Sequence, residues 1–105
     1  MTYRTNLDGN TCVLQIRGEL DAVSVPEIRA ELDRVVDERH RNVIVDLADL
    51  RVIDSSGVGA LVSLYKRVRA AGGLITVTRL RDQPLAILRL LKLDRVLAPQ
   101  AAAAA

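Results

Sequence analysis

The sequence predicts a single α/β domain with a mixed, mostly parallel sheet of four to five strands and three or more helices. The chain has 105 residues, enough for one hydrophobic core. Half of the residues are hydrophobic and 27% are charged, as is typical of a globular domain. Segments with strand periodicity alternate along the chain with segments of helical periodicity. We expect the domain to span residues 1–98 and the Ala-rich residues 99–105 to form a flexible C-terminal end.

The first half of the chain contains a strand, a helix and a second strand. Residues 12–18 alternate between two faces, which predicts a strand with one buried face. Ser24 and Glu27 have the spacing of a capping box, and Pro26 lies in the first turn, so a helix is expected to begin here. Its apolar stripe comprises Val25, Ile28, Leu32, Val35 and Val36. The β-branched run at residues 43–47 is typical of an interior strand.

The second half continues the alternation. A helix is expected over residues 57–71, where two glycines end it. Residues 74–78 read as the next strand, and residues 82–84 open a third helix. We expect up to one further strand at each end of the chain, the last of them at residues 96–97. The Ala-rich end shows no obvious closing helix. This order predicts largely parallel neighbouring strands with right-handed crossovers.

Composition excludes several classes of function. The chain has 15 Lys and Arg residues against 13 Asp and Glu residues, and only two aromatic residues, Tyr3 and Tyr65, which argues against a nucleic-acid surface. Cys12 is the only cysteine and is expected in the core, while the single histidine, His40, is expected in a solvated turn. The residues therefore predict no enzyme, no metal site and no cofactor. No signal peptide or membrane-spanning run is apparent, so we expect a cytoplasmic protein without a membrane partner.

Two loop segments are candidates for a functional site. In α/β folds, function tends to lie beyond the carboxyl ends of strands, where loops enter helices. Residues 18–21 and residues 54–59 fit that description. Asp54 and the two serines after it are good capping residues, and a helix entrance also tolerates a phosphate on Ser55 or Ser56. No glycine precedes either serine by two residues, and no histidine is close in sequence to act as a base, so a nucleophilic role is disfavoured.

These motifs resemble those of the STAS domain family, and more narrowly those of stand-alone bacterial anti-sigma factor antagonists. The resemblance extends over residues 12–97 and implies a single STAS-like domain. It rests on three segments in the family's order, which are Gly18-Glu19-Leu20-Asp21, Asp54-Ser55-Ser56-Gly57-Val58-Gly59 and Ala71-Gly72-Gly73. One departure is Ile53, which stands where larger apolar residues often occur.

The resemblance also implies roles for individual residues. Ser55 would be the phosphorylated serine, and Asp54 would shape its site. Ser56 and Gly57 would form the helix entrance beside it. Asp21 would line the same partner-binding surface, although a turn residue ahead of the first helix is an equally good interpretation.

The resemblance implies two protein partners. One is an anti-sigma factor that is also a serine-protein kinase, and the other is a PP2C-type phosphatase. The unphosphorylated antagonist would bind the anti-sigma factor and free the sigma factor for transcription, and phosphorylation would release it. Two alternatives remain: an accessory STAS subunit of a membrane lipid transporter, and a small nucleotide-binding domain whose helix entrance holds a phosphate.

Overall fold

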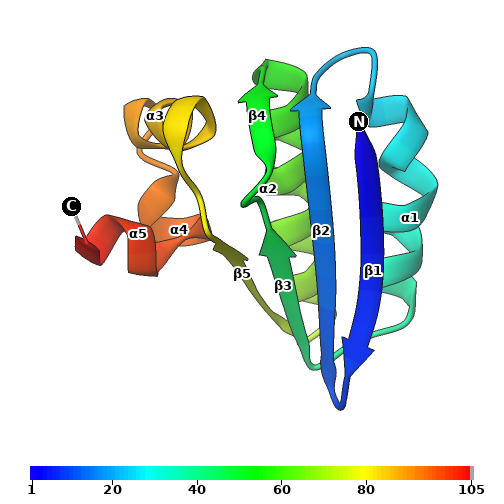
Figure 1. The fold of residues 1–105 in the computed structure, drawn as a ribbon. Coiled ribbons are helices and arrows are strands. Elements are labelled where there is room, and N and C mark those ends of the chain that lie inside the picture. Colours follow the sequence, from blue (N-terminus) through cyan, green and yellow to red (C-terminus); the bar gives the residue numbers. More distant parts are fainter. Residues whose placement is uncertain (105) are drawn as a thin grey trace.

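The computed structural model describes the backbone of residues 1–104 and the side chains of residues 1–101. Five strands and five helices follow one another in this part of the chain (Figure 1). They are β1 (Thr2–Asp8), β2 (Thr11–Leu20), α1 (Val25–Asp37), β3 (Asn42–Asp46), β4 (Leu50–Ile53), α2 (Ser55–Ala70), β5 (Leu74–Thr78), α3 (Asp82–Leu90), α4 (Asp94–Leu97) and α5 (Pro99–Ala104).

The strands form one mixed sheet, which confirms the predicted fold class. β1 pairs antiparallel with β2, and the other pairings are parallel. β3 pairs with residues 11–15 of β2, and β4 pairs with residues 18–20, so the two short strands follow one another along β2. β5 pairs with β3. The carboxyl ends of β2 and β4 therefore lie side by side at one end of the sheet (Figure 1).

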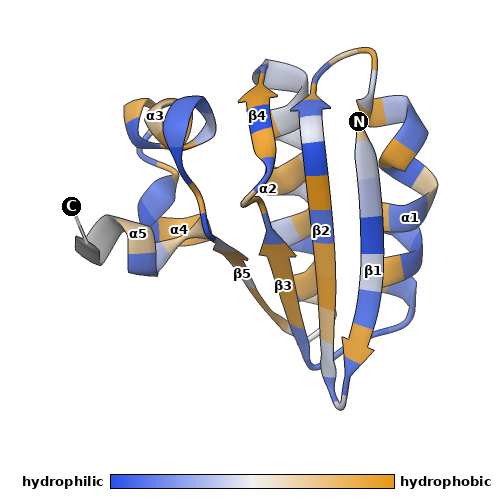
Figure 2. Ribbon diagram, viewed as in Figure 1, coloured by the Kyte–Doolittle hydropathy of each residue, from blue (hydrophilic) through white to orange (hydrophobic). Residues whose placement is uncertain are grey.

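The hydrophobic core lies between the sheet and the helices α1 and α2. On β2 the alternation is as predicted, since Cys12, Leu14 and Ile16 are at most 1% exposed. Residues Leu61, Leu64 and Val68 of α2 and the apolar stripe of α1 are also part of this core, except that Val36 is only partly buried and packs against it. Figure 2 shows hydrophobic residues concentrated in β2 and β3, the strands at the centre of the sheet.

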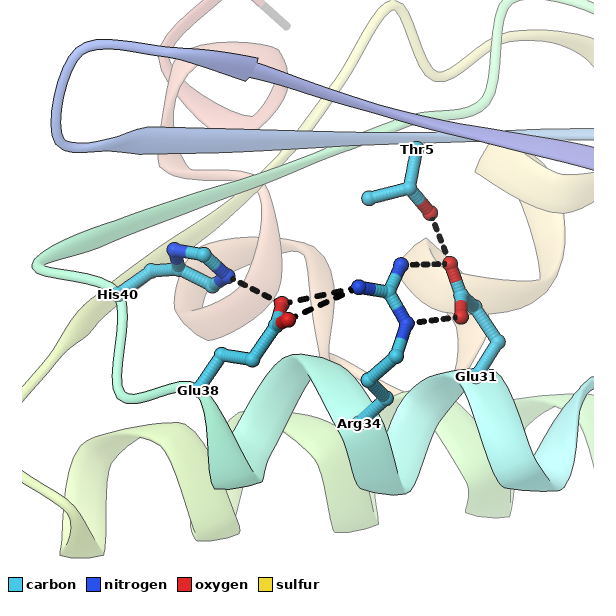
Figure 3. A network of polar contacts seen from close by, with 5 residues as sticks. All are labelled: Thr5, Glu31, Arg34, Glu38 and His40. Carbon is cyan, nitrogen blue, oxygen red and sulfur yellow. Dashed lines mark hydrogen bonds and ion pairs between the residues drawn. The ribbon is translucent and has the colours of Figure 1, made fainter.

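A polar network joins the edge strand β1 to α1 (Figure 3). The Thr5 hydroxyl donates to the Glu31 carboxylate, and Arg34 donates to Glu31 at 2.6 and 2.7 Å and to Glu38 at 3.0 and 3.1 Å. The hydrogen bonds that Glu31 accepts from Arg34 and Thr5, led by that from Arg34, lower the pKa of Glu31. The Nε2 atom of His40 lies 3.0 Å from Glu38. His40 was expected in a solvated turn, but its side chain is only 12% exposed.

Several elements differ from the expectation. α2 begins at Ser55, two residues earlier than predicted, and β4 was not foreseen as a strand. Residues 96–97, expected as a strand, belong to α4, because the 2%-exposed Leu97 packs in a helical turn. A run of two apolar residues has no period that separates strand from helix. The end that was expected to lack a closing helix forms α5, while the predicted flexibility of residues 99–105 stays a prediction.

Candidate functional site

The two predicted loop segments meet where β2 and β4 end. Leu20 and Ile53 are partners in the parallel pairing of these strands, and the Asp54 N–H donates to the Leu20 carbonyl at 3.2 Å. At the start of this segment Gly18 has a φ of 87° and the pairing register shifts by a bulge. Glycine adopts this left-handed conformation without strain, which explains the glycine of the first motif. The sheet topology thus brings segments 18–21 and 54–59 together.

Asp54 links the two segments through its side chain. One carboxylate oxygen, Oδ1, accepts the Gly57 N–H at 3.0 Å, which caps α2 as predicted. The other, Oδ2, accepts the Ala22 N–H at 3.1 Å, from the loop between β2 and α1. Sequence reasoning could not find this second contact, because Ala22 contributes only a backbone group and no residue type signals it.

Gly57 lets α2 approach β2 closely. A Cβ atom at this position would lie 2.2 Å from the Leu20 carbonyl oxygen and 2.7 Å from the Cγ1 atom of Ile53. Both distances are far below van der Waals contact, so only glycine fits here. Gly59, two residues later, is different, since a Cβ atom there would meet nothing within 4 Å. Gly57 is itself buried. It allows the first turn of α2 to pack against Leu20 and Ile53, and it does not form part of the exposed surface.

Ser55 and Ser56 are the first two residues of α2, and both are exposed. The first turn of a helix presents N–H groups without intrahelical partners, together with the positive end of the helix dipole. No acidic residue lies in the first turn of α2, and Asp54 precedes it as the N-cap. A hydroxyl in this position is accessible to an enzyme, and an added anion there is compatible with the fold.

Asp21 organises the loop that follows β2. Its Oδ1 atom accepts the N–H groups of Val23 at 3.1 Å and of Ser24 at 2.9 Å. The hydrogen bond from the Ser24 backbone is the main cause that lowers the pKa of Asp21. The turn interpretation of Asp21 therefore holds, and the same turn delivers Ala22 to Asp54.

The predicted capping box at Ser24 is wrong. Ser24 occupies the N-cap position of α1, but it has helical dihedral angles (φ −86°, ψ −27°) and makes no side-chain capping bond. An N-cap side chain normally needs an extended backbone to reach back to the helix. The Ser24 hydroxyl instead accepts the Asp21 N–H and donates to the Glu19 carbonyl, each at 2.9 Å. The Ser24 side chain therefore stabilises the loop between β2 and α1 and does not cap the helix.

Further exposed groups surround the site. Val23, at the loop between β2 and α1, is 80% exposed, and Arg51 of β4 forms an ion pair with Glu19 of β2 at 2.7 Å. A groove of about 530 Å³ between α1 and α2 begins at Ala22 and Ser56.

Within residues 1–104 no cluster of side chains has the composition of a metal site, and no helix has the length and hydrophobicity needed to cross a membrane.

Comparison with known proteins identifies the family. The family model of the STAS domain matches residues 3–103. The chain belongs to the STAS domain family. As a STAS domain it is similar to an anti-sigma F factor antagonist of Paenibacillus polymyxa, with 29% identity over 62% of this chain and 56% of the relative. It is also similar to the anti-sigma-B factor antagonist of Bacillus subtilis (strain 168), with 30% identity over 70% of this chain and 67% of the relative.

The STAS fold is also that of a solved anti-sigma factor antagonist. The structure of SpoIIAA in its unphosphorylated form superposes with a TM-score of 0.76, at 22% identity, over 88% of this chain and 82% of that one. The chain thus spans little more than half of the Paenibacillus relative and most of SpoIIAA. The fold and the family are in agreement with the resemblance of the sequence motifs.

Proposed function

We propose that this STAS domain is an anti-sigma factor antagonist that is switched by phosphorylation of Ser55. In the unphosphorylated state it binds an anti-sigma factor that is also a serine-protein kinase, which frees the sigma factor for transcription. Phosphorylation releases the antagonist, and a PP2C-type phosphatase reverses the modification. We place this activity in the cytoplasm, where sigma-factor-dependent transcription takes place. The observation that carries the proposal is the exposed Ser55 at the entrance of α2, directly after the capping residue Asp54.

The charge added by phosphorylation is sufficient for the switch. A phosphate brings about −1.5 to −2 charges at pH 7, and the N-terminus of α2 offsets part of this by roughly 0.3–1 kcal/mol. The domain therefore stays folded. An acidic partner group within about 4 Å would be repelled by roughly 4 kcal/mol per unit charge at an effective dielectric constant near 20. Since about 1.4 kcal/mol is a tenfold change in affinity, release needs no change of fold.

The surface around Ser55 is suited to docking. The loop that carries Val23 is held by the hydrogen bonds of Asp21 and Ser24, and Asp54 joins it to α2. A loop ordered before binding loses less entropy in the complex, so more of the contact energy is available as affinity. We infer that Asp21, Asp54 and Ser56 line this surface, while the buried Gly57 contributes by seating the helix.

The proposal is tested with Ser55→Ala and with Ser56→Ala as its matched control. The partner is first identified by co-purification from native lysate with mass spectrometry, which also locates the phosphate. With the purified partner kinase, Ser56→Ala should accept phosphate and Ser55→Ala should not. Ser55→Asp should bind the partner more weakly than the wild type.

Three outcomes would contradict the proposal. The first is phosphate incorporation into Ser55→Ala, and the second is wild-type affinity of Ser55→Asp for the kinase. The third is a stoichiometric complex with a transporter ATPase in place of a kinase. Retention of GTP or ATP in equilibrium dialysis would instead favour a nucleotide-binding domain.

A further inference from the structure

A side chain, and not a strand, closes the second edge of β4. Within residues 1–104 this strand pairs with β2 alone. At its other edge lies Gln83, the second residue of α3. The Gln83 Oε1 atom accepts the Ile53 N–H at 2.9 Å, and its Nε2 atom donates to the Ile53 carbonyl at 2.9 Å. The carboxamide thus supplies the acceptor and the donor that a neighbouring strand would supply.

Gln83 is the last of three alternate side chains that contact the chain segment from β3 to β4. The register between β3 and β5 ends at Asp46 and Thr78, and the Leu47 N–H donates to the Thr78 carbonyl at 3.1 Å. From there Arg79 donates to the Asp46 carboxylate at 2.5 and 3.0 Å, and Arg81 donates to the Ala48 carbonyl at 2.9 Å. We call the contacts of Arg79, Arg81 and Gln83 the side-chain ladder. Arg79 contacts the end of β3, Arg81 the connection between the strands, and Gln83 the end of β4.

The ladder ends next to the proposed phosphorylation site. Ile53 directly precedes Asp54, whose N–H donates to the Leu20 carbonyl at 3.2 Å. The chain is therefore held from β2 at Asp54 and from α3 at Ile53. We propose that Gln83 is a positioning residue for phosphorylation: by fixing the Ile53 backbone it fixes the Asp54 carboxylate and the Ser55 hydroxyl. This inference rests on the proposed function of Ser55.

The experiment compares Gln83→Leu, which removes both hydrogen bonds to Ile53, with Arg81→Ala. The control removes a contact of the same ladder but leaves Ile53 untouched. The kcat and KM of Ser55 phosphorylation by the co-purified kinase are measured well below the melting temperature of each variant. Because misplacement of a reacting group by about 1 Å can cost on the order of a hundredfold in rate, we expect kcat to fall roughly ten- to a hundredfold in Gln83→Leu. KM should change little, and Arg81→Ala should stay within about twofold of the wild type.

A second variant covers the case in which Gln83→Leu fails to fold. Gln83→Glu keeps the acceptor for the Ile53 N–H, but its carboxylate cannot donate to the Ile53 carbonyl at neutral pH. If both variants fold, the kcat of Gln83→Glu should lie between those of the wild type and Gln83→Leu. If only Gln83→Glu folds, its kcat should lie below that of the wild type. A purely stabilising role would lower the melting temperature of these variants without changing kcat.

Amide hydrogen exchange of the isolated protein gives a readout that needs no partner. The Ile53 amide should exchange at least about tenfold faster in Gln83→Leu, which removes its acceptor, than in Arg81→Ala. Unchanged exchange of the Ile53 amide in Gln83→Leu, or wild-type kcat in the Gln83 variants, would overturn this inference alone. A wild-type protein that the co-purified kinase does not phosphorylate would overturn the proposed function and this inference together.

Discussion

The Asp54 carboxylate accepts the backbone N–H of Ala22, a residue 32 positions earlier in the chain. Its other oxygen caps α2 at Gly57, so one side chain joins the loop after β2 to the helix that carries Ser55. Segments 18–21 and 54–59 are thereby joined, since Ala22 directly follows the first of them. Changes in either segment should affect the other.

Replacing Asp54 by Ala should destabilise the domain by about 0.5–2 kcal/mol, because α2 loses its N-cap and the loop loses its link to the helix. The change is measured by urea unfolding. Asp49→Ala is the control, since Asp49 is 57% exposed and makes only longer ion pairs, at 3.6 Å to Arg17 and 3.8 Å to Arg81. Equal stabilities for the two variants would argue against the bridging role of Asp54.

Gly57→Ala and Gly59→Ala should have opposite effects on stability. The new methyl group at position 57 would collide with the Leu20 carbonyl, whereas the one at position 59 meets open space. Forcing a methyl group into a closed site costs about 1–3 kcal/mol, while Gly to Ala in an open helical position gains roughly 0.5–1 kcal/mol. Thermal unfolding of both variants checks the prediction. A Gly57→Ala protein as stable as the wild type would contradict the close approach of α2 to β2.

Stability should fall in acid partly through Asp46. The side chain of this residue is 8% exposed, and its hydrogen bonds, led by those from Arg79, lower the pKa of the carboxyl in the folded state. A lowered folded pKa means that the unfolded chain binds protons more tightly. The contribution of this pair is therefore present above about pH 5 and is lost as the pH falls below about 4. In urea unfolding between pH 7 and pH 3, Asp46→Asn should lose less stability than the wild type, and an identical pH dependence would refute this.

Val23→Asp should weaken partner binding without loss of stability. The side chain is 80% exposed beside the proposed docking surface, so the folded domain loses little when it is changed. The added charge should repel the same partner groups as a phosphate on Ser55, and affinity for the kinase should fall by at least about tenfold. Leu74→Asp is the control, since Leu74 is 56% exposed at the opposite end of the sheet. Calorimetric titration of both variants decides the matter, and equal affinities would count against this docking surface.

Sequence periodicity was sufficient for the central elements. Strand β2 and helix α1 are long enough for their hydrophobic residues to show the two-residue period of a strand and the 3.6-residue period of a helix. Their buried faces were therefore predicted correctly. The cap at Asp54 was also predictable, because a residue type and its neighbours carry that signal. The α4 turn was missed because two apolar residues show no period.

Contacts between distant parts of the chain were not predictable. Ala22 acts through its backbone N–H, and Gln83 binds the backbone of a residue 30 positions away. Neither contact leaves a local pattern in the sequence. Ser24 shows the converse, since its spacing to Glu27 matched a capping box while its hydroxyl oxygen accepts the Asp21 N–H instead of an N–H of the helix.

The close contact between Gly57 and Leu20 limits how far the first turn of α2 can move relative to β2. With no room for even a methyl group between them, the first turn of α2 could not move inward over the end of β2 if Ser55 were phosphorylated. A phosphoryl group would then be displayed on a rigid platform. A partner would distinguish the two forms by the electrostatic potential it meets on arrival.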